Sequence, residues 1–315
     1  MDNTIKEMRA VYCETLIEVA KGDPRIMVVE ADLMKASGTM PFKQEFPERA
    51  LDVGVAEANL IGVSAGLSAS GKIPFAATFS CFASRRAFDQ FFISANYAKL
   101  NVKLVGTDPG ISAGFNGGTH MSFEDVGLMR MIPDLTIFEP CDPVELKALT
   151  IQAAQMYGCT YMRLHRKPIA PIYTEKESFA LGKGKVLCDG SDIAIFATGA
   201  ILVPEALKAH DVLKKQGIDA AVIDMHTVKP LDEKLVLKYA KKTGYILTAE
   251  NHQTAGGLGA AIANYLAKTC PVFMYMIGVQ DEFGQVATQA YLQKYYRMTA
   301  EEIALQAKRL LKTHR

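Results

Sequence analysis

Residues 51–92 read LDVGVAEANLIGVSAGLSASGKIPFAATFSCFASRRAFDQFF, and they place Glu57 among Val55, Ala56, Leu60 and Ile61. Residues 57–70 are predicted to form a helix, because small residues recur three or four positions apart and share one face: Ala58, Gly62, Ala65, Gly66 and Ala69. A face this small lets another backbone approach closely. An enclosed Glu57 is a candidate general acid or base. The alternative is a buried glutamate that hydrogen-bonds a backbone amide.

Residues 54–82, GVAEANLIGVSAGLSASGKIPFAATFSCF, resemble the pyrimidine-binding module of transketolases. Three further segments are similar to the same family and stand in its order: ADLMKASGT at 31–39, GGTHMSFEDVGLMRMIPDLTIFEPCDPVE at 117–145 and ENHQTAGGLGAAI at 250–262. None of the four is decisive alone. Together they are specific, and the resemblance covers nearly the whole chain.

The resemblance implies a role for this chain in binding thiamin diphosphate. In the family a glutamate hydrogen-bonds the pyrimidine ring and so promotes loss of the thiazolium C2 proton, and that residue corresponds to Glu57. The cofactor carries the organic chemistry, while the protein supplies the proton relay and the geometry. Phe79 and Phe82 match the aromatic residues that pack against the pyrimidine. Without the resemblance, they are two core aromatics at the end of a buried strand.

The long loop TDPGISAGFNGGTHMS at 107–122 is predicted to be functional, because structureless loops of this length are uncommon in compact domains. By resemblance it lines the substrate channel, and His120 contacts the carbonyl or hydroxyl groups of the donor sugar. Two positions depart from the family: its histidine at the start of the loop aligns with Asp108, and its aspartate aligns with Asn116. Both indicate a substrate unlike the usual ketose phosphates, or a different way of holding one.

Anion-binding candidates follow two predicted strands. Arg166, after the strand 160–164, best matches the family's phosphate-binding arginine, with Arg163 as the alternative. Asp32 and Ser37 follow the strand 25–29, where open parallel sheets bind ligands. By resemblance Asp32 lies near the cofactor. Asp32 capping a turn is an equally good interpretation, and the family's phosphate-binding serine aligns with Ala36.

Charged residues beside these motifs are open to two interpretations. Arg85 stands where transketolases commonly have a tyrosine. With Arg86 it forms either a phosphate clamp or, slightly favoured, a solvated helix start. Glu124 and Asp125 are predicted to be ordinary acids in the first turn of a helix, where negative charge suits the helix dipole.

Strands and helices alternate along the chain, which predicts an α/β fold with largely parallel sheets. We expect a transketolase-like pyrimidine-binding domain at 1–170, a linker at 171–189 and a smaller domain at 190–315 that is similar to the transketolase C-terminal domain. The segment 168–189 contains Pro, Gly and charged residues without strong periodicity.

Composition excludes several functional classes. The formal net charge of +1 does not indicate a nucleic-acid or anionic-membrane partner. The six cysteines include no CxxC pair, so we expect reduced thiols in a cytoplasmic protein. The N-terminal residues lack a signal-peptide pattern.

The chain lacks the GDG segment with which this family holds the diphosphate through Mg²⁺, and no clustered set of metal ligands stands out in the sequence. Together with the resemblance to the second half of a transketolase, this predicts a split enzyme. A separate N-terminal subunit would carry diphosphate and Mg²⁺, with two copies of each chain. The predicted reaction moves a two-carbon ketol unit from a ketose phosphate to an aldose acceptor.

Three alternatives stay open. The beta subunits of 2-oxoacid dehydrogenase decarboxylases share the two domains and the need for a partner, although their loop usually lacks a GGTH motif. A non-catalytic subunit that keeps the fold is a second possibility. A generic small-molecule binding module is the third.

Overall fold

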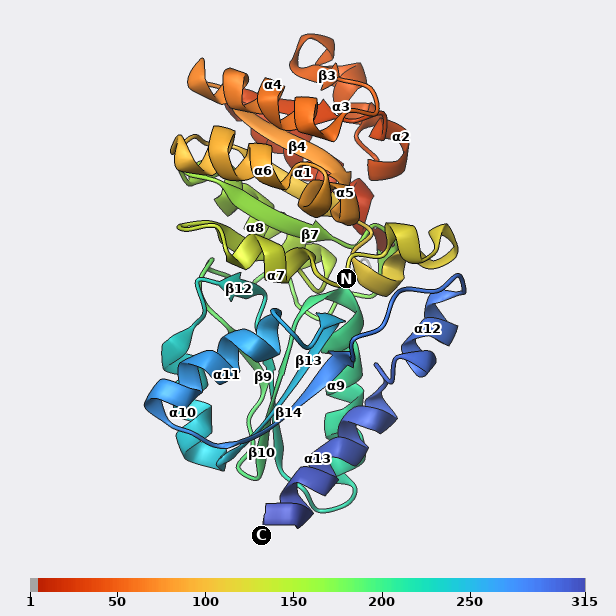
Figure 1. Ribbon diagram of the computed structural model, residues 1–315, viewed down its shortest axis with the longest axis vertical. Helices are drawn as coiled ribbons and strands as arrows, with labels where there is room; N and C mark the ends of the chain where they lie inside the picture. Colours follow the sequence, from red (N-terminus) through yellow and green to blue (C-terminus); the bar gives the residue numbers. More distant parts are fainter. Residues whose placement is uncertain (1–4, 315) are drawn as a thin grey trace.

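The N-terminal half of the chain is organised around a seven-stranded sheet in the order β12-β6-β7-β5-β4-β2-β3 (Figure 1). All neighbouring strands are parallel except β12, which runs antiparallel to β6. The computed structural model describes residues 5–314. The strands are β2 (Ile26–Glu30), β3 (Ala50–Asp52), β4 (Ile73–Phe79), β5 (Lys103–Thr107), β6 (Thr136–Phe138), β7 (Thr160–Leu164) and β12 (Thr227–Lys229).

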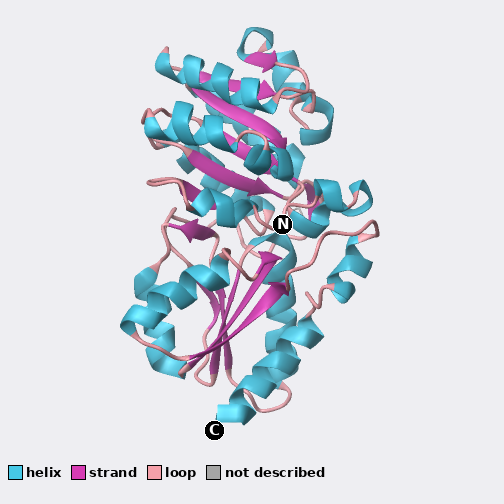
Figure 2. Cartoon of the chain, viewed as in Figure 1, coloured by secondary structure: helices cyan, strands magenta, loops and turns pink. Residues whose placement is uncertain are grey.

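Helices cover both faces of this sheet, which is why its central strands are buried on each side (Figure 2). One face packs against α1 (Met8–Gly22), α3 (Met40–Glu45) and α8 (Pro143–Gln155). The other packs against α4 (Glu57–Ala69), the π-helix η2 (Phe91–Tyr97) and α7 (Asp125–Arg130). Three short helices complete this half: α2 (Met34–Ser37), α5 (Ser80–Arg85) and α6 (Phe88–Gln90).

The C-terminal half contains a five-stranded sheet in the order β14-β13-β10-β11-β9, in which only β9 is antiparallel to its neighbour. Its strands are β9 (Lys185–Cys188), β10 (Ile193–Ala197), β11 (Ala220–Asp224), β13 (Tyr245–Gln253) and β14 (Phe273–Val279). Its helices are α9 (Gly199–Lys214), α10 (Glu233–Thr243), α11 (Leu258–Thr269), α12 (Gln289–Tyr295) and α13 (Ala300–His314). The predicted α/β fold with parallel sheets is confirmed.

Strand β9 begins at Lys185, inside the range that the sequence assigned to a linker. A short ladder, β1 (Lys6–Glu7) with β8 (Pro168–Ile169), ties the start of the first helix to the end of the first sheet. Helix α6 continues directly into the π-helix η2, where the Asn96 amide donates to the Phe91 carbonyl at 2.7 Å.

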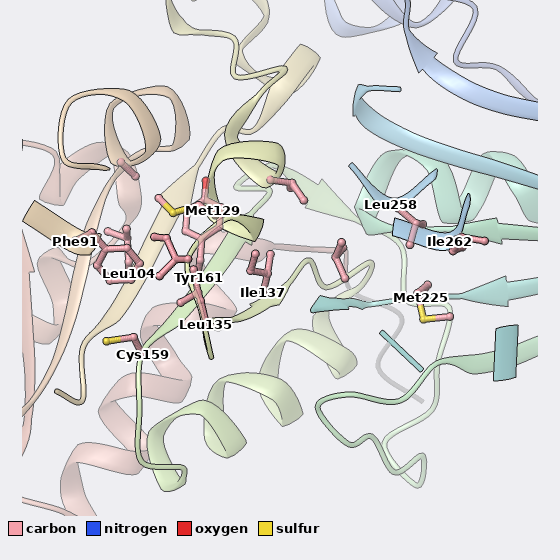
Figure 3. Close-up of a cluster of buried hydrophobic side chains, with 14 of the residues drawn as sticks. Phe91, Leu104, Met129, Leu135, Ile137, Cys159, Tyr161, Met225, Leu258 and Ile262 are labelled. Carbon is pink, nitrogen blue, oxygen red and sulfur yellow. The ribbon is translucent and has the colours of Figure 1, made fainter. Parts of the chain in front are cut away.

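The two halves share one hydrophobic cluster, which runs from Phe91 and Leu104 in the N-terminal half to Met225, Leu258 and Ile262 in the C-terminal half (Figure 3). The polypeptide after β11 also crosses back, and its residues 227–229 become the edge strand β12 of the first sheet. Packing and strand pairing therefore join the halves, so the carboxyl ends of the strands in the first sheet are held in a fixed frame.

Candidate active site

Glu57 is the first residue of α4, and its side chain is nearly buried, with the residue 5% exposed. Leu60 and Ile61 are fully buried beneath it, but Val55 is 71% exposed, so the predicted apolar enclosure is only one-sided. Of the predicted small-residue face, Ala65 is buried while Gly62 and Gly66 are exposed, and a Cβ atom on either glycine would meet nothing within 4 Å. That face of α4 is therefore open to another polypeptide.

Arg86 makes two contacts that reveal what the site can hold. Its Nη1 atom lies 3.1 Å from Glu57 Oε1, and its guanidinium carbon lies 3.9 Å from the centre of the Phe82 ring. A flat, nitrogen-rich cation thus stacks on Phe82 while it donates a hydrogen bond to Glu57. The aminopyrimidine ring of thiamin diphosphate would use the same two contacts, so these residues fit that end of the cofactor.

Phe79, Phe82 and His120 form an aromatic cluster at the carboxyl end of β4. The ring centres of Phe79 and Phe82 are 6.0 Å apart, and those of Phe82 and His120 are 5.2 Å apart with an edge-on geometry. His120 arrives from the loop after β5, which is folded into short 3-10 turns at residues 110–116 and 118–120. The structure thus brings together two residues assigned to the cofactor and one assigned to the substrate.

Arg85 holds the loop that carries His120. Its Nη2 atom donates to the Thr119 carbonyl at 2.9 Å, and its Nε atom lies 3.2 Å from Glu124 Oε1. Burial raises the pKa of Glu124, and the adjacent Arg85 charge opposes that rise. Arg85 is therefore neither a phosphate clamp nor a solvated helix start, the two interpretations of the sequence. It binds a backbone carbonyl and a carboxylate of its own chain.

Arg166 lies beside the aromatic cluster, with its guanidinium carbon 5.9 Å from the centre of the Phe79 ring. Its Nε atom pairs with Asp108 Oδ1 at 2.8 Å. Asp108 is only 1% exposed, and burial raises its pKa to about 6 despite the nearby arginine. Asp108 therefore orients Arg166, while about a quarter of the arginine side chain stays exposed to solvent.

The remaining predicted site residues differ in their access to solvent. Ser37 is buried and donates to Glu30 Oε1 at 2.5 Å, beside a second bond from Thr39 at 2.6 Å. Burial raises the pKa of Glu30 to about 7. Asp32 and Asn116 are exposed, and Asp32 has a left-handed backbone with φ of 60°.

Arg163, the alternative anion site, is enclosed and unavailable. Its Nε atom lies 2.8 Å from Asp125 Oδ2 and its Nη1 atom 2.7 Å from Glu139 Oε2, while Nη2 donates to the Asn251 carbonyl at 2.9 Å. Asp125 is an acid in the first turn of α7, as predicted, but the sequence did not show that it is also buried in an ion network. Sequence reasoning missed this network because its members lie far apart along the chain.

Comparison with known proteins identifies the family. A model described as transketolase, pyrimidine binding domain, matches residues 6–170, and one described as transketolase, C-terminal domain, matches residues 182–303. The chain belongs to the transketolase family. The suspected family and the order of its two modules are thus confirmed.

Transketolase subunits are among the similar proteins. The 6-deoxy-6-sulfo-D-fructose transketolase subunit SqwH of Clostridium sp. (strain MSTE9) is 51% identical, over 94% of this chain and 92% of its own. One subunit of the apulose-4-phosphate transketolase of Phocaeicola vulgatus (strain ATCC 8482) is 34% identical, over 90% of each chain. A solved structure described as split gene transketolase, inactive beta4 tetramer, is similar with a TM-score of 0.91 and 39% identity, over 98% of this chain and 99% of that one.

A search of the helices within residues 5–314 finds none that is long and apolar enough to span a membrane.

Proposed function

We propose that this chain is the C-terminal subunit of a two-chain, thiamin diphosphate-dependent transketolase that moves a two-carbon ketol unit from a ketose carrying an anionic group to an aldose. The observation that carries the proposal is the joint contact of Arg86 with Glu57 and the Phe82 ring, which marks a place for a flat nitrogen heterocycle. Three supporting side chains, Phe79, His120 and Arg166, lie around it.

Each residue has a task in this proposal. Thiamin diphosphate, when bound, supplies the carbon nucleophile that accepts the ketol unit. Glu57 holds or shares a proton with the pyrimidine through its carboxylate, and Phe79 and Phe82 seat that ring. Asp32, at the carboxyl end of β2, borders the cofactor.

The substrate side of the site is polar and partly cationic. His120 is 2.9 Å from the Thr119 hydroxyl through Nδ1, which leaves Nε2 available to the donor's oxygens. Asn116 is exposed on the same loop, and Arg166 offers its free nitrogen atoms to an anionic group. In this proposal Asp108 and Ser37 support the site from beneath, because both are buried and engaged within the chain.

The partner would carry the other end of the cofactor. The family resemblance assigns diphosphate and Mg²⁺ binding to a separate N-terminal subunit, with two copies of each chain. Two relatives of similar length are named as transketolase subunits, and a third is described as an inactive tetramer of beta chains. We therefore expect this chain to be inactive alone and active once the partner is added, and we expect the assembled enzyme to act in the cytoplasm.

The decisive experiment measures ketol transfer by the co-expressed pair with wild-type chain, Glu57→Gln and Glu233→Gln. Glu233 is also the first residue of a helix, but in α10, so it controls for the loss of a first-turn charge. We expect Glu57→Gln to lower kcat roughly 10²- to 10⁴-fold and the control to match wild type. Donors with a sulfonate and with a phosphate should be tested in parallel. Unchanged turnover in Glu57→Gln would reject the proposal.

An assay with a 2-oxoacid and a lipoyl acceptor, run on the same pair, tests the other enzyme class. Turnover there, without ketol transfer, would replace the transketolase assignment with that of a 2-oxoacid dehydrogenase component.

A further inference from the structure

A second group of reactive side chains lies at the junction of the two sheets, away from the candidate active site. Cys141 precedes α8, Glu145 is in its first turn, and Asp224 ends β11. One ligand atom from each of these residues lies within 4.8 Å of the other two. All three side chains are fully buried.

Each carboxylate of this group has one oxygen held by a neighbour and one left free. Glu145 Oε2 accepts from the Cys141 amide at 2.7 Å, and Asp224 Oδ2 accepts from the Tyr173 hydroxyl at 2.8 Å. Glu145 Oε1 and Asp224 Oδ1 have no hydrogen-bond donor. Buried polar atoms rarely lack a partner, and each costs roughly 1–3 kcal/mol when it does.

A histidine that is 1% exposed also points into the group. His226 Nε2 lies 3.9 Å from the free oxygen of Glu145, while Nδ1 lies 2.9 Å from the Thr227 hydroxyl. Because Nδ1 is engaged by Thr227, Nε2 is the ring atom available as a ligand. Outer partners that orient the ligands in this way are typical of metal sites.

The charges of the group require a positive counterpart. Two unneutralised carboxylates are unfavourable in an apolar interior. Among the described residues, no Lys or Arg forms an ion pair with either of them. Either a shared proton or a cation can satisfy the two free oxygens.

We propose that Cys141, Glu145, Asp224 and His226 bind a zinc-class divalent cation that fastens the two halves of the chain together. Thiolate, imidazole and carboxylate are the ligands that zinc prefers, and four protein ligands make a closed, structural site. Neighbouring ligands of a tetrahedral zinc ion lie roughly 3–4 Å apart, so the three ligand atoms that now lie within 4.8 Å of one another, and the His226 ring beside them, have to move closer together on binding. On binding, the Cys141 S–H bond breaks, a sulfur–metal bond forms and the proton leaves to solvent.

His226 also lines a hollow of about 300 Å³, together with Phe179, Lys183 and Lys185. Two ligands come from the N-terminal half and two from the C-terminal half, so the bound ion would resist their separation.

Metal content is the primary test. The full-length chain, without a histidine tag, is incubated with zinc sulfate, dialysed and assayed for zinc by mass spectrometry. We expect about one zinc ion per chain in the wild type and in Cys159→Ser, a buried thiol outside the group. Cys141→Ser and Glu145→Gln should retain almost none. Zinc should raise the wild-type Tm by several degrees, and a chelator should reverse this shift.

If Cys141→Ser does not fold, a spectroscopic test that does not need this variant still decides whether the metal ion binds. Cobalt(II) added to the wild-type chain should give a thiolate charge-transfer band in the near ultraviolet. Glu145→Gln keeps the side-chain volume and should lack this band. A wild-type chain with no retained zinc, no cobalt band and a Tm indifferent to the chelator would overturn the proposal. The two carboxyl groups would then simply share a proton.

Discussion

Arginine–carboxylate ion pairs occur in two regions of the molecule, and the two sets differ in how far their side chains are exposed to solvent. At the junction, Arg163 is 1% exposed and its partners Asp125 and Glu139 are equally buried. At the carboxyl end of β4, the side chains of Arg85 and Arg86 are 42% and 52% exposed although each contacts a carboxylate. The first arrangement is a buried, structural ion network. The second leaves cationic groups that a ligand or a partner chain can recruit.

The largest expected effect on folding stability comes from removing the charge of Arg163 in the buried ion network. Arg163→Met would leave Asp125 and Glu139 as uncompensated buried charges, which typically costs about 3–5 kcal/mol of folding free energy. Urea unfolding at neutral pH measures this loss. Arg25→Met, at an exposed ion pair with Asp23, is the matched control and should unfold near the wild-type midpoint. Equal midpoints for both variants would show that the junction network contributes no more than a surface pair.

A smaller effect on folding stability is expected at Glu30, a buried carboxylate in the half of the chain that carries the candidate active site. Burial raises its folded pKa to about 7 from an unfolded value near 4.5. Between these values the unfolded chain ionises first, so the wild type loses stability as pH rises from 4.5 to 7. Glu30→Gln keeps the Oε1 acceptor used by Ser37 and Thr39 and removes this dependence.

Chemical denaturation across pH 4–8 measures the Glu30 effect. Relative to wild type, Glu30→Gln should gain stability over that interval, by roughly 3 kcal/mol above pH 7. Ser37→Ala is a useful companion, because it removes one hydrogen bond to the same oxygen but keeps the acid. A constant difference between wild type and Glu30→Gln at all pH values would contradict the raised pKa.

The smallest of these effects concerns the contacts by which Arg85 holds the loop that carries His120. Arg85→Gln would release the Thr119 carbonyl and the Glu124 carboxylate, so the His120 loop would be held less firmly. We expect the KM for the donor sugar to rise roughly 10-fold with a smaller change in kcat, since positioning errors weaken productive binding. Steady-state kinetics of the assembled enzyme measure both constants. Arg85→Lys should restore part of the loss, and identical kinetics for all three forms would exclude a positioning role.

Local pattern was sufficient to predict much of the fold. The strand 160–164 has the predicted bounds, and α4 begins at Glu57 as expected. The carboxylate of Glu250 accepts from the Leu258 and Gly259 amides at the start of α11. Such features depend on residues close together in the chain.

Features that depend on distant residues were not predicted. Strand β12 is three residues long and exists because β6, about ninety positions earlier, offers it a sheet edge. Arg163 was the alternative phosphate-binding arginine in the sequence, but in the structure Asp125 and Glu139 occupy its guanidinium group. The Cys141 group escaped attention for the same reason, since Asp224 follows 83 positions later. These contacts were not predicted because the residues lie far apart in the sequence, not because the interactions are weak.

The crossing of β12 into the first sheet limits how the chain can be divided. A fragment that ends near residue 190 would lack β12 and would expose the hydrogen-bonding groups of β6 along an open edge. Such an edge invites aggregation, so the pyrimidine-binding half is a poor candidate for expression by itself. A gene fusion or a domain exchange should therefore take both modules together, with its boundaries outside residues 5–314.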